Sequence, residues 1–170
     1  MRRRNIKRPL FLASSLFAAI FALGSDQPSV QVKRTAAVGP RLLEKQTEAA
    51  VIRDYLQAWQ TMGVALEQNQ AGLLDADFTG TAKEKLTGTI RDQADLGIRT
   101  RYRDTSHDLQ LVFYSPEGQS IQLVDSVEYA EQILDHEKVQ TTQHVHARYV
   151  AVLTPTEVRW KVRIFQAESE

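Results

Sequence analysis

Residues 109–129 read LQLVFYSPEGQSIQLVDSVEY, and this stretch decides the fold. Side chains alternate with a period of two over 109–114 and again over 121–129. That period predicts two β-strands, each with one face toward a core. The Ser-Pro-Glu-Gly stretch at 115–118 between them is typical of a tight turn. Two strands joined by a tight turn pair antiparallel, so we expect a β-hairpin here.

The same pattern continues toward the C-terminus. Strands are predicted over 144–153 and 158–165, with turns at 135–138 and 154–157. The stretch 99–107 adds a further strand before the hairpin. Consecutive strands joined by turns predict an antiparallel meander of four to five strands.

The chain before residue 97 has a helical period instead. A long amphipathic helix is predicted over 41–69, with one apolar stripe formed by Ile52, Tyr55, Leu56, Trp59, Met62 and Leu66. A short helical turn is expected over 71–78. Thr81 and Glu84 have the spacing of a capping box for a helix over 81–96, and Gly97 fits the position that ends it. Helices followed by strands predict an α+β fold, in which a long N-terminal helix and shorter helices pack on a curled antiparallel sheet.

The N-terminus predicts export. Residues 1–9 carry five basic side chains, residues 10–23 are almost wholly apolar, and small residues follow. We therefore expect residues 1–24 to be a signal peptide, with the alternative of an uncleaved signal anchor that leaves the domain outside the cytoplasm. Residues 25–40 are expected to be a flexible linker, 41–166 a single cone-like domain, and 167–170 a tail.

Composition excludes several functions. The 170 residues include no cysteine, which excludes disulfides, zinc–cysteine sites and lipoprotein acylation. The full chain has no formal net charge, but removal of residues 1–24 leaves 16 basic and 21 acidic residues. A domain with a net charge of −5 gives no reason to expect a nucleic-acid partner. No nucleotide-binding, hydrolase or zinc-protease motif is present, and we expect no cofactor.

The order of these elements resembles the nuclear transport factor 2-like superfamily, including its SnoaL-like and ketosteroid isomerase-like proteins. The resemblance rests on the helix around Tyr55 and Trp59, the helix over 81–96 and the four strands between 109 and 165. It implies a cone with a pocket between helices and sheet, and often a homodimer through the open sheet face. The family includes enzymes, scaffolds and ligand binders, so the resemblance does not select a function.

Two histidines are candidate metal ligands. His144 and His146 are two residues apart on a predicted strand, so their side chains point the same way. A shared metal would need a further ligand from His107, Asp125, Glu128 or Glu131. The alternative is that both histidines lie on the polar face of a half-buried strand.

The candidate catalytic residues are Asp125, His107 and His146. Asp125 falls in the apolar register of its strand, and an inward carboxylate must be paired or have a raised pKa. Either a bulge or pairing with Arg148 would explain it without catalysis. His107 lies in a polar cluster with Tyr102, Asp104 and Asp108, where an Asp–His pair could act as an acid and base.

Tyr55, Trp59, Tyr114, Asp125 and Trp160 are the candidate pocket residues, with plain core packing as the alternative for the aromatic ones. Three functions follow as hypotheses. The first is an exported, non-enzymatic module that binds a small apolar ligand or a protein partner. The second is a cavity enzyme of the isomerase or hydrolase type that uses an inward carboxylate. The third is a membrane-tethered scaffold.

Overall fold

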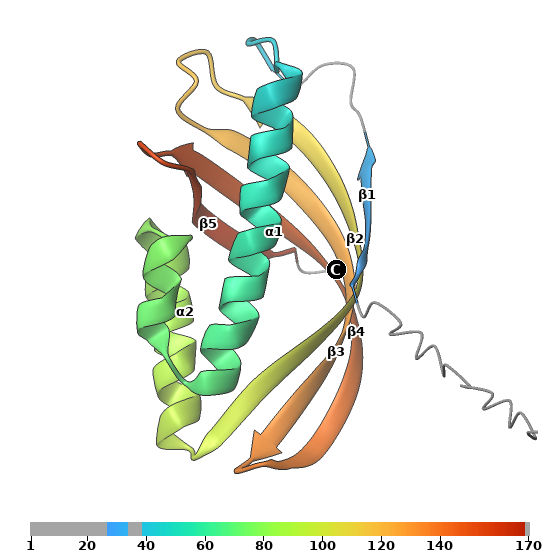
Figure 1. The fold of residues 1–170 in the computed structure, drawn as a ribbon, viewed down its shortest axis with the longest axis vertical. Helices are drawn as coiled ribbons and strands as arrows, with labels where there is room; N and C mark the ends of the chain where they lie inside the picture. Colours follow the sequence, from blue (N-terminus) through green and yellow to red (C-terminus); the bar gives the residue numbers. More distant parts are fainter. Residues whose placement is uncertain (1–26, 34–38, 169–170) are drawn as a thin grey trace, which may run out of the picture.

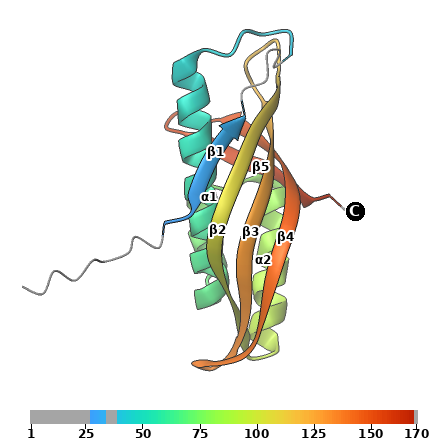
Figure 2. The same cartoon turned by 90° about the vertical axis from the view of Figure 1, so that its right-hand side faces the viewer.

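The computed structural model describes residues 27–33 and 39–168. The predicted signal segment over 1–24 lies outside the described residues. The elements in chain order are β1 (Ser29–Lys33), α1 (Lys45–Gln68), the 3₁₀ helix η1 (Ala71–Ala76), α2 (Gly80–Asp95), β2 (Ile98–Tyr114), β3 (Ile121–Asp135), β4 (Lys138–Pro155) and β5 (Trp160–Ala167). The α+β class is confirmed: α1 and α2 cover one face of a curled sheet (Figures 1 and 2).

The sheet has five strands in the order β1-β2-β3-β4-β5. Strands β2 to β5 form the predicted antiparallel meander, and the stretches expected over 99–107 and 109–114 are one continuous strand. The fifth strand is β1, which pairs parallel with Ser106–Gln110 of β2. It lies within the range 25–40 that the sequence predicts as a linker. All five of its residues are exposed, so it has no buried face to produce an alternating pattern.

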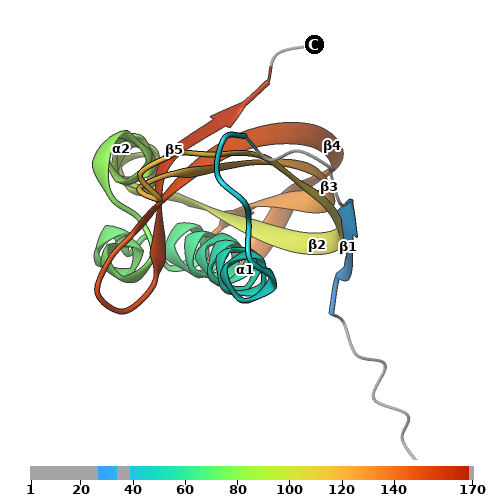
Figure 3. The same ribbon diagram turned by 90° about the horizontal axis from the view of Figure 1, so that it is seen from above.

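Helix α1 carries the core-facing stripe, which includes Tyr55, Trp59, Met62 and Leu66. Its most deeply buried positions also include Val51, Ala58 and Ala65, and Ile52 and Leu56 pack at the margin of the core. The helix ends at Asn69, whose left-handed backbone (φ 54°) lets its amide return to the last carbonyls. Figure 3 shows α1 lying along the sheet, on the same side as α2.

The predicted capping box of α2 is wrong in detail. The helix begins one residue earlier, at Gly80, and Thr79 is the N-cap residue, without a side-chain capping bond. The Thr81 hydroxyl instead donates to the carbonyl of Arg163 in β5. The Thr81 hydroxyl therefore bonds to the sheet, whereas the local sequence pattern predicts a bond within the helix. Gly97 follows the helix with φ 71°, as expected for a helix-ending glycine.

A β-bulge in β2 places two polar residues on the same face. The register with β3 shifts between Asp104 and Ser106, which leaves Thr105 as the extra residue. Asp104 lies opposite Tyr129, and His107 lies opposite Val127. Because Tyr129 and Val127 both face the helices, Asp104 and His107 do so as well, although they are an odd number of positions apart, with two residues between them.

Candidate functional site

A buried hydrogen-bonded triad connects helix α1 to the sheet. The Tyr55 hydroxyl donates to Asp125 Oδ2 at 2.9 Å, and His107 Nδ1 lies 2.7 Å from the same oxygen. The three side chains are at most 1% exposed. The expectation that Asp125 points inward is therefore confirmed. Arg148 is not its partner, since it forms an ion pair with Glu168.

The triad keeps the Tyr55 phenol protonated. Burial raises the pKa of the Tyr55 phenol well above its ordinary value, and the negative charge of Asp125 raises it further. Tyr55 therefore remains a hydrogen-bond donor. The His107 ring fits the same scheme when Nδ1 carries the proton that faces the carboxylate.

An aromatic cluster surrounds the triad. Trp59 is at its centre, with the His107 ring edge-on at 5.1 Å and the Tyr102 ring stacked at 6.2 Å. Tyr129 and Tyr149 approach Trp59 edge-on from β3 and β4, and their hydroxyls are 3.1 Å apart. These two tyrosines are not among the candidate residues predicted from the sequence. The alternation of inward and outward residues could have identified them, because each occupies an inward position on its strand.

Three buried polar atoms in this region have no hydrogen-bond partner among the described residues. They are Trp59 Nε1, Asp104 Oδ1 and Asp125 Oδ1. Such atoms are uncommon in folded proteins, because an unpaired buried polar group costs free energy. Asp104 differs from the other two residues, because neither oxygen of its carboxylate forms a hydrogen bond or an ion pair with a described residue.

Asp104 also lines a groove of about 670 Å³ between α1, the start of β1 and β2. Tyr102, Gln60 and Pro28 are further lining residues, and the exposed Arg103 lines the groove as well. The volume is within the ~300–1,000 Å³ typical of small-molecule sites. The groove therefore combines an aromatic wall with an unpaired carboxylate.

The predicted pocket residues separate into two places. Tyr55, Trp59 and Asp125 lie together in the triad and the aromatic cluster. Tyr114 and Trp160 contact each other elsewhere, with ring centroids 6.4 Å apart. Tyr114 pairs with Ile121 of β3, whereas Asp125 pairs with Leu109. Ile121 and Asp125 are four positions apart on β3, or about 13 Å along an extended strand.

The two candidate metal ligands lie on the outer face of the sheet. His144 and His146 are exposed on β4. His146 lines a separate depression of about 260 Å³ with Glu128 and Asp108, which forms an ion pair with Lys33. No group of three metal-ligating side chains occurs among residues 27–33 and 39–168.

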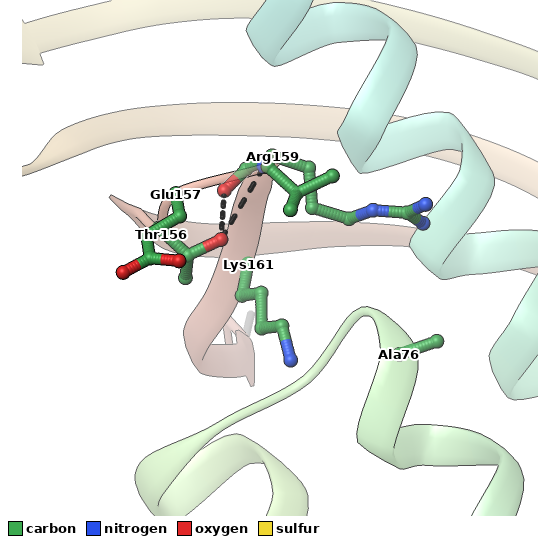
Figure 4. A pocket seen from close by; sticks show the side chains of 6 residues that line it. Ala76, Thr156, Glu157, Arg159 and Lys161 are labelled. Carbon is green, nitrogen blue, oxygen red and sulfur yellow. Dashed lines mark hydrogen bonds between the residues drawn. The ribbon is translucent and has the colours of Figure 1, made fainter.

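A second pocket, of about 470 Å³, lies between η1 and the turn that joins β4 to β5 (Figure 4). Thr156 and Arg159 close that turn through three hydrogen bonds, two of which involve the Thr156 hydroxyl. Both cations of the pocket are already engaged: Arg159 binds Asp77 at 2.7 Å, and Lys161 donates to the carbonyl of Asp75 at 2.7 Å. This pocket therefore offers a ligand fewer unpaired groups than the groove at Asp104.

The described residues include no helix that is long and apolar enough to span a membrane.

No family model and no curated protein matches the chain. Several solved structures, however, are similar to the chain. The intermembrane space region of the chloroplast protein ARC6 is 13% identical, with a TM-score of 0.59 over 76% of this chain and 100% of that one. A putative scytalone dehydratase from Novosphingobium aromaticivorans is 11% identical (TM-score 0.52, 74% of this chain and 89% of that one). Aln2 from a Streptomyces species is 12% identical (TM-score 0.50, 75% and 93%).

These similarities confirm the fold. The chain has the cone fold of the nuclear transport factor 2-like superfamily. At this level of identity the function does not follow from the fold.

Proposed function

We propose that this protein is an exported, non-enzymatic module that binds a small ligand in the groove beside Asp104. One observation carries the proposal: a carboxylate without a partner, with one oxygen buried, lines a groove of ligand size. A ligand that donates a hydrogen bond to Asp104 would remove the cost of leaving that oxygen unpaired.

The groove chemistry favours a cation with a planar apolar part. Burial raises the pKa of the Tyr102 phenol, and the negative charges of Glu131 and Asp104 contribute. Two carboxylates therefore lie near Tyr102, and a ligand ammonium group would be attracted to both the Asp104 carboxylate and the ring face. The opposing charge of Arg103 is exposed and screened by solvent. This ligand is more polar than the apolar one that the sequence suggests.

In this proposal the triad is a support for the groove. The Asp125 carboxylate holds Tyr55 of α1 and His107 of β2 at the same oxygen. Trp59 then packs between His107 and Tyr102, whose ring forms the groove wall. Because all three triad side chains are buried, their role here is to fix the distance between α1 and β2.

Native mass spectrometry of the purified chain, followed by denaturing mass spectrometry, tests the binding role. We expect extra mass that disappears on denaturation and that Asp104→Asn reduces. Asp108→Asn is the control, because Asp108 lies on the outer face of the same strand and its exposed ion pair with Lys33 contributes little to stability. Equal retention of the ligand by both variants would contradict the proposal.

An acid–base enzyme is the second candidate. The observation in its favour is the 2.7 Å contact between His107 and Asp125, because a carboxylate that orients a histidine is a common arrangement for proton transfer. This candidate predicts that a captured compound changes in mass or chromatographic retention when it is incubated with fresh protein. His107→Gln would abolish the change but retain binding. An unchanged compound favours the binding module.

The export part of the proposal rests on the basic and apolar segments of residues 1–24. Expression in a bacterial host, with fractionation and N-terminal mass analysis, tests it. We expect a mature chain that begins near Ser25 and is found outside the cytoplasm. An intact N-terminus in the membrane fraction would favour the tethered scaffold, and an intact chain in the cytoplasm would contradict export.

A further inference from the structure

The outer edge of β4 is unpaired over half of its length. Strand β4 runs from Lys138 to Pro155, but β5 pairs only with Tyr149–Pro155. One more bond, from the Glu168 amide to the Arg148 carbonyl, extends this pairing by a residue. Within residues 27–33 and 39–168, no segment pairs with the edge from Lys138 to Ala147. Figure 1 shows β4 extending beyond β5 toward the hairpin tip.

The strand geometry identifies the backbone groups at this edge. Because the Arg148 carbonyl faces β5, the alternation of an extended strand turns the amides and carbonyls of Thr142, His144 and His146 the same way. The register with β3 is regular from Thr141 to Leu153, so no bulge interrupts this alternation. Their side chains are exposed.

The other edges of the sheet are short, covered or charged. Strand β1 forms the edge beside β2 and has only five residues, ending in Lys33, and Arg99, Arg101 and Arg103 lie along the part of β2 that β1 does not pair with. The segment before α2 covers β5, through bonds between Thr79 and the Val162 carbonyl and between the Val162 amide and Asp77. Covering and charge are the usual means by which proteins prevent strand pairing at an edge.

The β4 edge has little such protection. Residues 139–147 read VQTTQHVHA, with no proline, lysine, arginine or acidic residue. One bulge, at Gln140, lies close to the hairpin tip. Valine and threonine occupy four of these nine positions and favour extended structure. The edge is therefore suited to pairing with another strand.

We propose that the β4 edge pairs antiparallel with the same edge of a second copy of this chain, which joins the two five-stranded sheets into one. The pairing centres on Gln143. Thr142 of each copy then lies opposite His144 of the other, and both residues present their amide and carbonyl groups to the partner. Lys138 of one copy lies toward Arg148 of the other, and the positive charge of Arg148 is already balanced by its ion pair with Glu168.

A second copy fits this edge better than an unrelated peptide does. Strand addition by a peptide gains specificity from pockets beside the edge that accept alternate side chains. Here the outward side chains are uncharged or histidine, and the charges lie only at the two ends. An antiparallel pair related by a two-fold axis uses both ends equally.

The experiment compares two double variants of the full chain by analytical ultracentrifugation over a concentration series. In T142K/H144K, lysines face lysines across the new strand pair, and we expect dimerisation to weaken at least about tenfold. In T142K/H144E, each lysine faces a glutamate, and we expect the dimer to persist. Both side chains are exposed, and the residues opposite them on β3, Gln132 and Ala130, are uncharged, so both variants should fold.

Hydrogen exchange supplies an independent readout. We expect the amides of Thr142, His144 and His146 to become protected as the protein concentration rises. A monomer at the highest soluble concentration would overturn the proposal, and so would a dimer that T142K/H144K leaves unchanged. Loss of the dimer in T142K/H144E would overturn the register. If these amides became protected in a monomer only when a synthetic peptide of residues 138–148 was added, the edge would be a peptide site instead.

Discussion

Replacing Tyr55 by phenylalanine tests the role of the triad. The change removes one hydroxyl and leaves the ring, so it creates no cavity large enough to matter. The lost bond runs from Tyr55 to the Asp125 carboxylate at 2.9 Å, and both side chains are at most 1% exposed. A hydrogen bond to a charged group contributes about 1.5–3 kcal/mol, and no solvent is close enough to replace this one. We expect Tyr55→Phe to lower the free energy of unfolding by about 2 kcal/mol.

The matched control is Tyr129→Phe. It also removes a phenolic hydroxyl from the aromatic cluster, but its partner is the neutral hydroxyl of Tyr149 at 3.1 Å. Neutral hydrogen bonds contribute about 0.5–1.5 kcal/mol, so we expect a smaller loss. Urea titration of both variants in a Trp160→Phe background reports both values, with Trp59 fluorescence as the signal because Trp59 contacts His107 and Tyr129. If Tyr55→Phe costs no more than Tyr129→Phe, the carboxylate does not strengthen the triad and our reasoning is wrong.

Two further predictions concern buried groups. Burial raises the pKa of three phenols above the ordinary value of about 10, so they ionise in the unfolded chain before they do so in the native protein. The stability that these phenols contribute is complete below pH ~10 and falls above it, by about 1.4 kcal/mol per pH unit for each phenol. When the free energy of unfolding is plotted against alkaline pH, the slope should therefore be smaller for Tyr55→Phe. The three phenols are those of Tyr55, Tyr102 and Tyr129. Asp77→Ala should lower the free energy of unfolding by about 3 kcal/mol, because Asp77 is 2% exposed and binds both Thr61 and Arg159. Its control, Asp75→Ala, breaks an exposed ion pair with Lys83 and should change stability by less than about 1 kcal/mol; equal losses in urea would contradict this assignment.

Regular periodicity made much of the fold predictable. Buried positions are apolar, and this produces the helical stripe around Trp59 and the period of two after residue 109. These two patterns predict the α+β class and the meander. The inward position of Asp125 was predictable for the same reason, because its neighbours at 121, 123 and 127 are apolar.

The site was less predictable, because it depends on a local irregularity. The bulge at Thr105 turns Asp104 and His107 to the same face, and no residue type in 98–108 signals where a bulge occurs. Strand β1 has no buried face, so it produced no pattern. The hydroxyl of Thr81 contacts Arg163, which lies 82 residues later in the chain, and local sequence cannot show this contact.

A fluorescence titration of the groove shows whether Asp104 binds a cationic ligand there. The Trp160→Phe variant leaves Trp59 as the only tryptophan, and 2-phenylethylamine is the probe, with neutral 2-phenylethanol as the comparison. We predict saturable quenching by the amine, weaker binding of the alcohol, at least about a tenfold loss of amine affinity in Asp104→Asn, and no loss in Asp108→Asn. Equal affinity in the two aspartate variants, or no saturable binding of the amine, would contradict the account.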